Sequence, residues 1–427
     1  MAGIWPVYRE SKRMTTKELS TTEAGSARQI QQCIDEVAAG GGGRVVLPPM
    51  DLTLDRGLAL GSGIELVGQG ENTILRKGPG RIYPLSGYHN YGMCDVPLQS
   101  TSGLEPGMTV SVHDDKGGGF SETFATITWV EDHWIGLDHG IETDYRQADN
   151  PRLTTAYPLI FAHDVSNIAV RDLRLEGHKA DNEESMGACR GAAVYFYRSA
   201  AIEVSGVSEC DYDGEGLGFQ ICRDVVIRNC TFRDNSGNGL HPGAGSTNVL
   251  FEDCDSHGNG NCGFFFCVRA NHISVRDSRF TGNRTGISIG TRDCYNLIEN
   301  CTVDGNAGAG ILVRSSPRPV EVHSCHVRGC TIAGNAATGG KGQIEIVTDA
   351  HDLIFEDNTV RGREGGGACK PGFFIEDTAR DIHLQNNDVD GCGQEVEAAA
   401  QSLALTAPVI ECGYESGTDT IYRHLPA

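Results

Sequence analysis

GFFFCVRANHISVRDSRFTGNRTGISIG, residues 263–290, contains one complete repeat and the start of the next. A glycine opens the apolar run GFFFCV, a second run follows in HISVRDSRF, and TGNRT leads to another glycine-led run, GISIG. Apolar and polar side chains alternate along these runs with a period of two, which is typical of half-buried β-strands. The Asn and Gly between the runs are residues that tight turns require. The stretch therefore predicts about three short strands and no helix in each repeat.

The same pattern recurs on both sides of this stretch. The small residue that opens the first strand returns every 23 or 24 residues, as Ala193, Gly216, Gly239, Gly263, Gly286 and Gly310. A repeat of this length, built from short strands, predicts an all-β parallel β-helix in which each coil stacks about 4.8 Å above the last. Leucine-rich repeats need a leucine signature that this chain lacks, and propeller blades need about 40 residues.

Cysteines occupy one column of the repeat. Cys230, Cys254, Cys301 and Cys325 fall at the same position, with Ser278 between them. No C-x-x-C pair is present, so the column predicts a stack of small inward-facing or turn-facing side chains rather than a metal site. The chain has 16 cysteines but no recognisable export signal, which favours reduced thiols over disulfides.

The ends and the charge of the chain limit its partners. The opening residues, MAGIWPVYRESKRMTTKELS, lack the apolar core of a secretory signal, and no stretch has the roughly 20 apolar residues that cross a bilayer. We therefore expect a cytoplasmic protein, or a secreted one if a leader has been removed. A net charge of −22 argues against nucleic acids and anionic membranes as partners. The sequence leaves homo-oligomer formation open.

The sequence divides into five segments. Residues 1–25 are an N-terminal arm, 26–99 a capping helix and the first coils, 100–150 an inserted small β unit, 151–392 the β-helix core, and 393–427 a C-terminal cap. In the helix, Ser26 is the expected N-cap, and Ile30, Cys33, Ile34 and Val37 form one apolar face. Such a helix would cover the open first coil, whose free strand edges otherwise invite aggregation.

Several of these motifs resemble a known superfamily. IQQCIDEVAAGGGGRVVLPP followed by GIELVGQG resembles the N-terminal signature of the pectate-lyase-like right-handed parallel β-helix superfamily. GNGLHPGAGS, CGFFFCVR and GISIGTRD are similar to bacterial right-handed β-helix repeat proteins. The resemblance implies a right-handed parallel β-helix over nearly the whole chain. The chain lacks the Asn-Thr-Asp, Asp-Asp, Gly-His-Gly and Arg-Ile-Lys set of polygalacturonases, and also the calcium-aspartate and arginine pattern of pectate lyases. The resemblance therefore does not fix the reaction.

A groove is expected on the outward side of the first strands. Counting from each small residue, every second position points outward, which places His241 between Gln220 and Arg269 of the adjacent coils. The glycines around His241 predict a backbone left bare for a ligand. The residues expected to bind substrate are Gln220, Tyr195, Tyr197, Arg190, Arg269, Arg292, Asp293 and Arg314.

The turns that precede these strands bring acids to the same rim. The residues expected to be catalytic are Asp213, Glu215, His241, Asp181 and Lys179. A glycosidase needs two carboxyl groups about 5–9.5 Å apart, which Asp213 or Glu215 could form with Asp181 or Glu183 of the coil before.

Three classes of function remain open. The first expectation is a glycoside hydrolase that cleaves an acidic polysaccharide or oligosaccharide with paired carboxylates. The alternative is a polysaccharide lyase that acts on uronates by β-elimination. Here a Lys, Arg or His would take the proton, and Arg or Ca²⁺ would neutralise the carboxylate; the residues that could play these parts are Lys179, Arg190, His241 and Arg269, and the acidic loop could hold the Ca²⁺. No other cofactor is expected. The third class is a non-catalytic solenoid that binds glycans. It ranks last because it does not explain why titratable groups converge over three or four coils.

Overall fold

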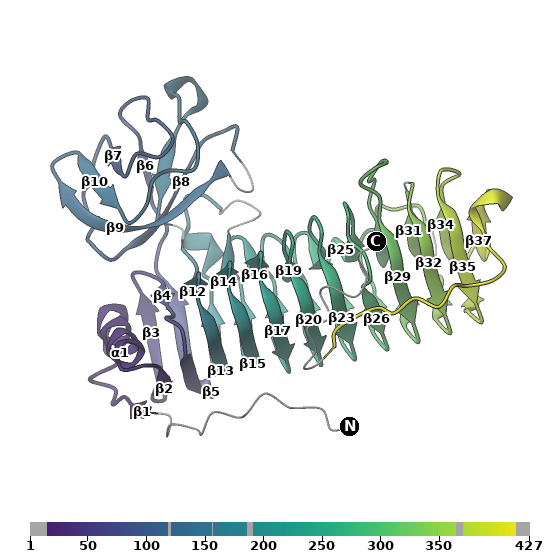
Figure 1. Cartoon of the computed structure of the whole chain (residues 1–427), viewed down its shortest axis with the longest axis horizontal. Helices are drawn as coiled ribbons and strands as arrows, with labels where there is room; N and C mark the ends of the chain where they lie inside the picture. The colour runs from purple at the N-terminus through teal and green to yellow at the C-terminus, as the bar shows by residue number, and fades with distance from the viewer. Residues whose placement is uncertain are drawn as a thin grey trace, which may run out of the picture.

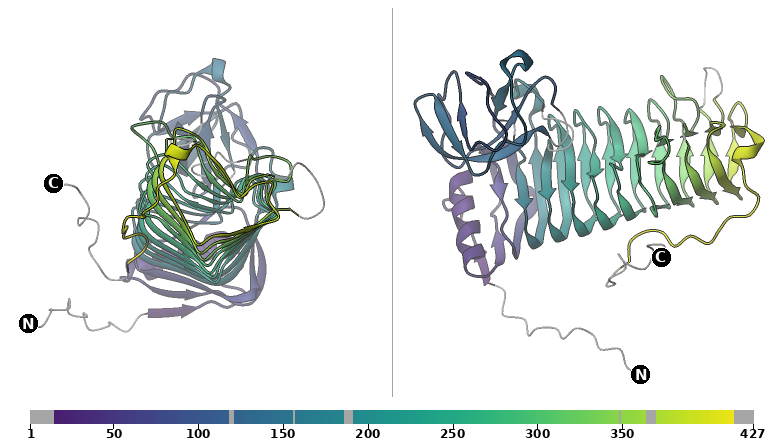
Figure 2. Two further views of the ribbon diagram at one scale, coloured as in Figure 1. Left: turned by 90° about the vertical axis from the view of Figure 1, so that its right-hand side faces the viewer. Right: turned by 45° about the horizontal axis from the view of Figure 1, so that its top comes forward.

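The computed structural model describes residues 15–117, 121–155, 157–185, 191–347, 349–363 and 370–415. The chain winds into a long parallel β-helix, with one α-helix at its first end and a small β unit projecting beside the first coils (Figure 1). Seen along its axis, the β-helix stacks its coils in close register (Figure 2). The predicted fold class is confirmed.

One wall of the β-helix is an 11-stranded parallel sheet built from the first strand of each repeat. Its strands are β4 (Leu58–Ala59), β12 (Ile160–His163), β14 (Ala192–Tyr197), β16 (Glu215–Gln220), β19 (Leu240–Pro242), β22 (Cys262–Phe265), β25 (Thr285–Ile289), β28 (Ile311–Val313), β31 (Ile344–Ile346), β34 (Phe373–Ile375) and β37 (Val396–Ala398). The predicted inward positions, such as Leu217, Phe264 and Ile311, are buried in the common core.

The remaining strands of the coils form one 20-stranded sheet with two parallel ladders. The first ladder contains β1 (Thr15–Glu18), β2 (Gly43–Val46), β5 (Ile64–Lys77), β13 (Ser166–Glu176), β15 (Ala200–Cys210), β17 (Arg223–Arg228), β20 (Thr247–Glu252), β23 (Asn271–Arg276), β26 (Leu297–Glu299), β29 (His323–Arg328), β32 (His351–Glu356) and β35 (Arg380–Gln385). The second contains β3 (Met50–Leu54), β18 (Thr231–Arg233), β21 (Asp255–His257), β24 (Arg279–Thr281), β27 (Thr302–Asp304), β30 (Thr331–Ala333), β33 (Thr359–Arg361) and β36 (Asp388–Asp390). The long strands β5, β13 and β15 run through both ladders.

Two columns of buried side chains, one of asparagines and one mostly of cysteines, stabilise the turns between the strands. In the first, the Oδ1 atom of each asparagine accepts hydrogen bonds from the backbone N–H and Nδ2 of the asparagine one coil before. The column runs through Asn235, Asn259, Asn283, Asn306 and Asn335. In the second, the cysteine column is buried as expected, but its last member is Cys330 rather than Cys325, because a longer coil pairs Thr302 with Thr331. The cysteines in the described part of the chain are free thiols.

The α-helix caps the first coil as the sequence predicts. It spans α1 (Ala27–Ala39), and the Oγ of Ser26 accepts a hydrogen bond from the backbone N–H of Gln29 at 3.3 Å. Its predicted apolar face is buried against the first coils. No helix in the described residues is both long and apolar enough to cross a membrane.

The small β unit starts earlier in the sequence than residue 100. It is a six-stranded antiparallel sheet of β6 (Ile82–Pro84), β7 (Asp95–Pro97), β8 (Thr109–His113), β9 (Thr123–Glu131), β10 (Trp134–Leu137) and β11 (Arg152–Thr154). The three-residue strands β6 and β7 are too short to give a visible alternation. The unit has a hydrophobic core of its own, separate from that of the β-helix.

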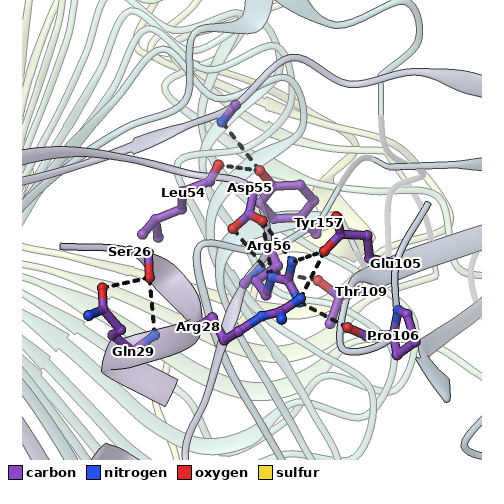
Figure 3. A network of polar contacts seen from close by, with 12 residues as sticks. Ser26, Arg28, Gln29, Leu54, Asp55, Arg56, Glu105, Pro106, Thr109 and Tyr157 are labelled. Carbon is purple, nitrogen blue, oxygen red and sulfur yellow. Dashed lines mark hydrogen bonds and ion pairs between the residues drawn. The ribbon is translucent and has the colours of Figure 1, made fainter. Parts of the chain in front are cut away.

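Arg56 fastens this unit to the first coils (Figure 3). Its guanidinium is buried; Nη1 donates to the carbonyl oxygen of Pro106 at 3.0 Å, and Nη2 pairs with Asp55 at 2.7 Å. Arg28 of α1 reaches the same junction through Glu105 at 2.8 Å. The junction fixes the unit beside the 11-stranded sheet.

The C-terminal segment does not simply close the last coil. After β37 and a short 3₁₀ turn (Ala400–Ser402), the chain runs back along the 20-stranded sheet. Backbone N–H groups of Ala404, Gly413 and Tyr414 donate to coils progressively nearer the N-terminus. The segment expected to be a cap is therefore a strap along one side.

Candidate functional site

The candidate site lies on the outward face of the 11-stranded sheet, where β16, β19, β22, β25 and β28 are neighbours. The register places His241 beside Gly218 of the coil before, and pairs Phe265 with Ser288 of the next coil. His241 is therefore on the outward side, as predicted. Its neighbours differ from the prediction, because Gln220 pairs with the next position, Gly243, and Arg269 lies beyond the end of β22.

Glu215 and His241 form a buried pair. Nδ1 of His241 lies 2.6 Å from Oε2 of Glu215, and the two side chains are only 1% and 4% exposed, in that order. The other carboxylate oxygen, Oε1, accepts a hydrogen bond from Nδ2 of Asn238 at 2.6 Å. Nε2 of His241 makes no hydrogen bond of ordinary geometry with a described residue, although the Cys267 thiol lies near enough to affect the ring.

The pair holds a proton at neutral pH. Burial lowers the pKa of His241, but the charge of Glu215 and the hydrogen bonds of Cys267 and Glu215 outweigh it and raise the pKa to about 10. Burial also raises the pKa of Glu215, partly offset by His241 and Asn238. Both shifts favour retention of one proton between the two groups. His241 is thus an imidazolium whose Nδ1 faces Glu215 and whose ring also interacts with the Cys267 thiol.

Arg314 extends this cationic region along the face. Its guanidinium carbon lies 4.2 Å from the centre of the Phe265 ring, and the same ring meets His241 edge to face at 5.1 Å between centroids. The Arg314 Nη1 atom donates to Oγ of Ser288 at 2.9 Å, and Nη2 to the carbonyl oxygen of Phe266 at 2.8 Å. These contacts fix the direction in which the guanidinium faces.

Asp293 supports Arg314 rather than the surface of the groove. It is fully buried, and its Oδ2 and Oδ1 atoms accept hydrogen bonds from the backbone N–H groups of Gly290 and Ala270 at 2.7 and 3.0 Å. Nη2 of Arg314 lies 3.9 Å from Oδ2. Both carboxylate oxygens of Asp293 are engaged by these partners, so the expected direct contact of Asp293 with the substrate is wrong.

The glycines near His241 serve packing rather than ligand clearance. A Cβ at Gly243 would lie 2.0 Å from Cδ of Gln220, and a Cβ at Gly239 would lie 1.9 Å from Oγ of Ser256. Gln220 fills the space above Gly243, and its Oε1 accepts a hydrogen bond from the backbone N–H of Ala244 at 2.5 Å. Its Nε2 atom is buried with no hydrogen-bond partner in the described part of the chain.

The two tyrosines occupy different environments. Tyr195 is buried, because Phe124 of the inserted unit and His163 pack edge-on against it at 6.2 and 5.8 Å. Tyr197 is half-buried and lies under the guanidinium of Arg198 at 5.0 Å. It borders a cleft of about 410 Å³ between the unit and the coils, lined by Phe124, Asp138, His139, Glu142, His163, Asp164, Tyr197 and Arg198.

The acids of the preceding turns make contacts of their own. Oδ1 of Asp213 accepts a hydrogen bond from Oγ of Ser236 at 2.7 Å, and Asp181 lies 3.6 Å from Nδ1 of His178. Nζ of Lys179 lies 3.4 Å from Oδ1 of Asp211 and also donates to the carbonyl oxygen of Asp234. These contacts tie the rim turns to one another.

Two further acids of this loop fasten the inserted unit. Glu183 contacts Arg81 at 3.2 Å and the backbone N–H of Ile82 at 2.8 Å. Glu184 pairs with Arg152. The carboxylate of Glu183 is therefore engaged by the inserted unit.

Arg269 and Arg292 form a second cationic feature at the end of this face. The backbone N–H of Arg269 donates to the carbonyl of Thr291 at 2.9 Å, so the two arginines lie in adjacent coils at the same turn. Both side chains are exposed, and no ion pair joins either of them to an acid among the described residues. Arg190, which was also expected to bind substrate, lies outside the described residues.

Sequence reasoning missed three neighbours of His241: Asn238, Phe265 and Cys267. The outward spacing already places Phe265 and Cys267 on this face, so the register contained the signal for them. Asn238 is in the turn before β19, where asparagine is common for structural reasons, and nothing in its spacing distinguishes it.

Comparisons with known proteins support the architecture. A family described as "Right handed beta helix region" matches residues 160–327, and one described as "Periplasmic copper-binding protein (NosD)" matches residues 253–403. A mannuronan C5-epimerase, AlgE5 of Azotobacter vinelandii, is 25% identical over 135 residues, which is 32% of this chain but 13% of that protein.

Two solved structures share the fold. The A-module of the mannuronan C-5 epimerase AlgE6 of Azotobacter vinelandii superposes with a TM-score of 0.58 at 16% identity, covering 89% of this chain and 95% of the module. The polygalacturonase of Erwinia carotovora ssp. carotovora gives a TM-score of 0.52 at 12% identity, covering 94% and 99% of the two chains. At these identities the likeness concerns the fold alone.

The name of the second family raises the question of copper. Among the described residues, no three His, Cys, Asp or Glu side chains are arranged to hold a metal ion. His323 and His351 lie within the matched region, but their rings stack face to face at 5.2 Å rather than converging on a point. The donor set of the described residues does not fit a copper centre.

Proposed function

We propose, because the chain belongs to the pectate-lyase-like right-handed parallel β-helix superfamily, that it is an enzyme that modifies a polysaccharide on the outward face of its 11-stranded sheet. The finer proposal is that it moves a proton at C5 of a uronate residue, as an epimerase or a lyase does. The buried Glu215–His241 pair carries this proposal together with Arg314, because His241 and the guanidinium of Arg314, from coils three apart, both contact the ring of Phe265 on this face.

The charge of the pair decides the role of His241. Removal of the C5 proton sends its electron pair into the neighbouring carboxylate, whose growing negative charge must be stabilised. An imidazolium with a pKa of about 10 is already protonated at neutral pH, so it is a poor base and a good hydrogen-bond donor. His241 and Arg314 are therefore assigned to the carboxylate.

The carbanion that forms when the C5 proton is removed can react in two ways. If a proton returns to C5 from the opposite face of the ring, the product is the C5 epimer. If the C4–O bond breaks instead, the chain is cleaved and a C4–C5 double bond remains. The curated relative named above is a mannuronan C5-epimerase, which supports epimerisation as the first outcome to test.

The geometry is less favourable to a hydrolase. A hydrolase needs one free carboxylic acid and one free carboxylate on either side of the bond. Glu215 is engaged by His241 and Asn238, Glu183 by Arg81, and the remaining rim acids by their own turns. Hydrolysis is therefore retained as the competing outcome of the experiment.

The exposed arginines favour an acidic polymer as the substrate. Arg269 and Arg292 stack one coil apart without described acidic partners, on a chain whose net charge is −22. Two adjacent guanidinium groups repel each other unless an anion lies between them, and their planar N–H groups match a carboxylate in pairs.

The test uses polymannuronate and polygalacturonate in D₂O. Two results are expected alternatives: inverted sugars that carry solvent deuterium at C5 by NMR, which indicate epimerisation, or a new ultraviolet absorbance from the C4–C5 double bond, which indicates elimination. New reducing ends without deuterium or absorbance would establish the hydrolase instead. Unchanged polymers, with the same protein folded by circular dichroism, would overturn the uronate proposal.

A further inference from the structure

The inserted β unit carries an aromatic surface that neither its core nor the candidate site uses. Trp129 of β9 and Trp134 of β10 are each 42% exposed, and Met93 before β7 is exposed to the same extent. These strands form the side of the unit that faces away from the later coils (Figure 1). Two of the three tryptophans of the chain are thus on one small sheet and in contact with solvent.

A β-bulge places Trp129 on this outer side. Gly136 pairs with Trp129 and Leu137 with Ile127, so Thr128 is the extra residue between them. Without the bulge, Trp129 would follow Ile127 into the core of the unit, since side chains two residues apart share a face. Trp134 pairs with Glu131 on the same outer side, one step diagonally from Trp129.

The indole of Trp129 lies flat on the sheet. A Cβ added at Gly136 would be 1.9 Å from Nε1 of Trp129, so the ring covers the glycine and turns its other face to solvent. Any larger residue at position 136 would lift the ring. The glycine and the bulge together therefore hold a flat aromatic face outward.

The surroundings of the two rings are polar and negative. Residues 123–139 contain Glu131, Asp132 and Asp138 but no lysine or arginine. Such a surface repels nucleic acids, polyuronates and anionic membranes. Its carboxylates accept hydrogen bonds, which suits a ligand rich in neutral hydroxyl groups.

The area of the rings is too small for a protein partner. With a whole tryptophan side chain near 250 Å², the two exposed faces amount to roughly 200 Å², whereas a stable protein interface needs about 800 Å² on each side. A pyranose ring matches this size. The C–H groups on one of its faces are apolar and weakly positive, and the aromatic face is negative.

We propose that this surface, made of Trp129, Trp134 and the acids beside them, is a binding site for a neutral polysaccharide, whose sugar rings stack on the two indoles. Strand β9 connects it to the cleft, because Phe124 at the cleft is five residues, or about 17 Å, from Trp129. The inserted unit is thus a glycan anchor beside the candidate site. The assignment does not depend on the proposed uronate chemistry.

Affinity electrophoresis of the full chain tests the proposal. Gels contain a neutral polymer (mixed-linkage β-glucan, xylan or glucomannan) or an anionic one (alginate or polygalacturonate). We expect retardation by at least one neutral polymer, and a loss of affinity of about tenfold in Trp129→Ala and in Trp134→Ala. Leu405→Ala removes a fully exposed apolar side chain elsewhere and is the control.

Tryptophan emission provides a second measurement that does not need the alanine variants to fold. In a Trp5→Phe background the emission comes from Trp129 and Trp134 alone. We expect this tryptophan emission to shift in wavelength or to be quenched when the neutral polymer that retards the protein is added. No retardation by any neutral polymer, retardation by anionic polymers only, or unchanged affinity in both alanine variants would overturn the proposal. Light scattering provides one more possible contradiction. If the chain forms dimers and both substitutions abolish them, the surface is a contact between copies of the chain and the proposal is overturned.

Discussion

Nδ1 of His241 lies 2.6 Å from Oε2 of Glu215, and both side chains are removed from solvent on the outward face of a parallel sheet. A charged pair in such a position stabilises the fold only while both partners are present. The ring of His241 also interacts with the thiol of Cys267. A structural role and a catalytic role therefore make different predictions for single and double substitutions.

Removal of one partner should cost both turnover and stability. His241→Gln leaves Glu215 as a buried charge without a counter-ion, which lowers the free energy of unfolding by about 3–5 kcal/mol. The double variant His241→Gln with Glu215→Gln should regain most of that stability, since no buried charge remains. It should not regain turnover. Urea denaturation and the polymer assay measure the two effects, and a double variant with wild-type turnover would assign the pair to folding alone.

The pair should also make stability depend on pH above neutrality. The pKa of His241 rises from 6.5 in the unfolded chain to about 10 in the folded one, so the folded state holds the extra proton between these values. This contribution is complete below pH 6.5 and is lost as the pH rises through about 10. The slope for one proton is at most about 1.4 kcal/mol per pH unit. Denaturation of the wild type and of the double variant from pH 6.5 to 10 isolates this contribution, and parallel curves would contradict it.

The sequence was enough to predict the architecture because the repeat is long and regular. Period-two alternation identified the inward residues, and the spacing of the small residues identified the first strand of each coil. The assignment failed where a coil changed length, as at Cys325, since a register counted from one copy assumes that the next copy is equally long.

The candidate site was less predictable for a physical reason. An outward position in a strand pattern is not necessarily an exposed one, because a distant segment can cover it. Phe124 covers Tyr195, and Gln220 fills the space that Gly243 leaves. The bond between His241 and Glu215 joins residues 26 positions apart in adjacent coils, and neither local propensity nor periodicity specifies the rotamers that bring them together.

The packing role of Gly243 can be tested directly. Gly243→Ala should displace the Gln220 side chain and break its hydrogen bond to Ala244, which lowers the free energy of unfolding by about 1–3 kcal/mol. Gly87→Ala is the control, since a Cβ there meets no heavy atom within 4 Å. The double variant Gly243→Ala with Gln220→Ala should relieve the clash. Thermal unfolding measures the stability of the three variants. If Gly243→Ala alone leaves the stability unchanged, the glycine is instead interpreted as clearing space for a ligand.

Arg269 and Arg292 should determine how tightly an acidic polymer binds rather than how fast it reacts. Each lies at the end of the face in an exposed turn, so Arg269→Gln or Arg292→Gln should raise KM about two- to fivefold, the range of an exposed ion pair of about 0.4–1 kcal/mol, with little change in kcat. Raising the salt concentration should weaken the wild type more than the double variant, because salt screens these charges. Arg223→Gln, at an exposed arginine on β17 of the other sheet, should change neither value. If the double variant instead lost kcat at unchanged KM, or if its KM rose equally for a neutral polymer, the two guanidinium groups would not be the carboxylate contact, and the acidic substrate would have to be recognised at Arg314 and His241 alone.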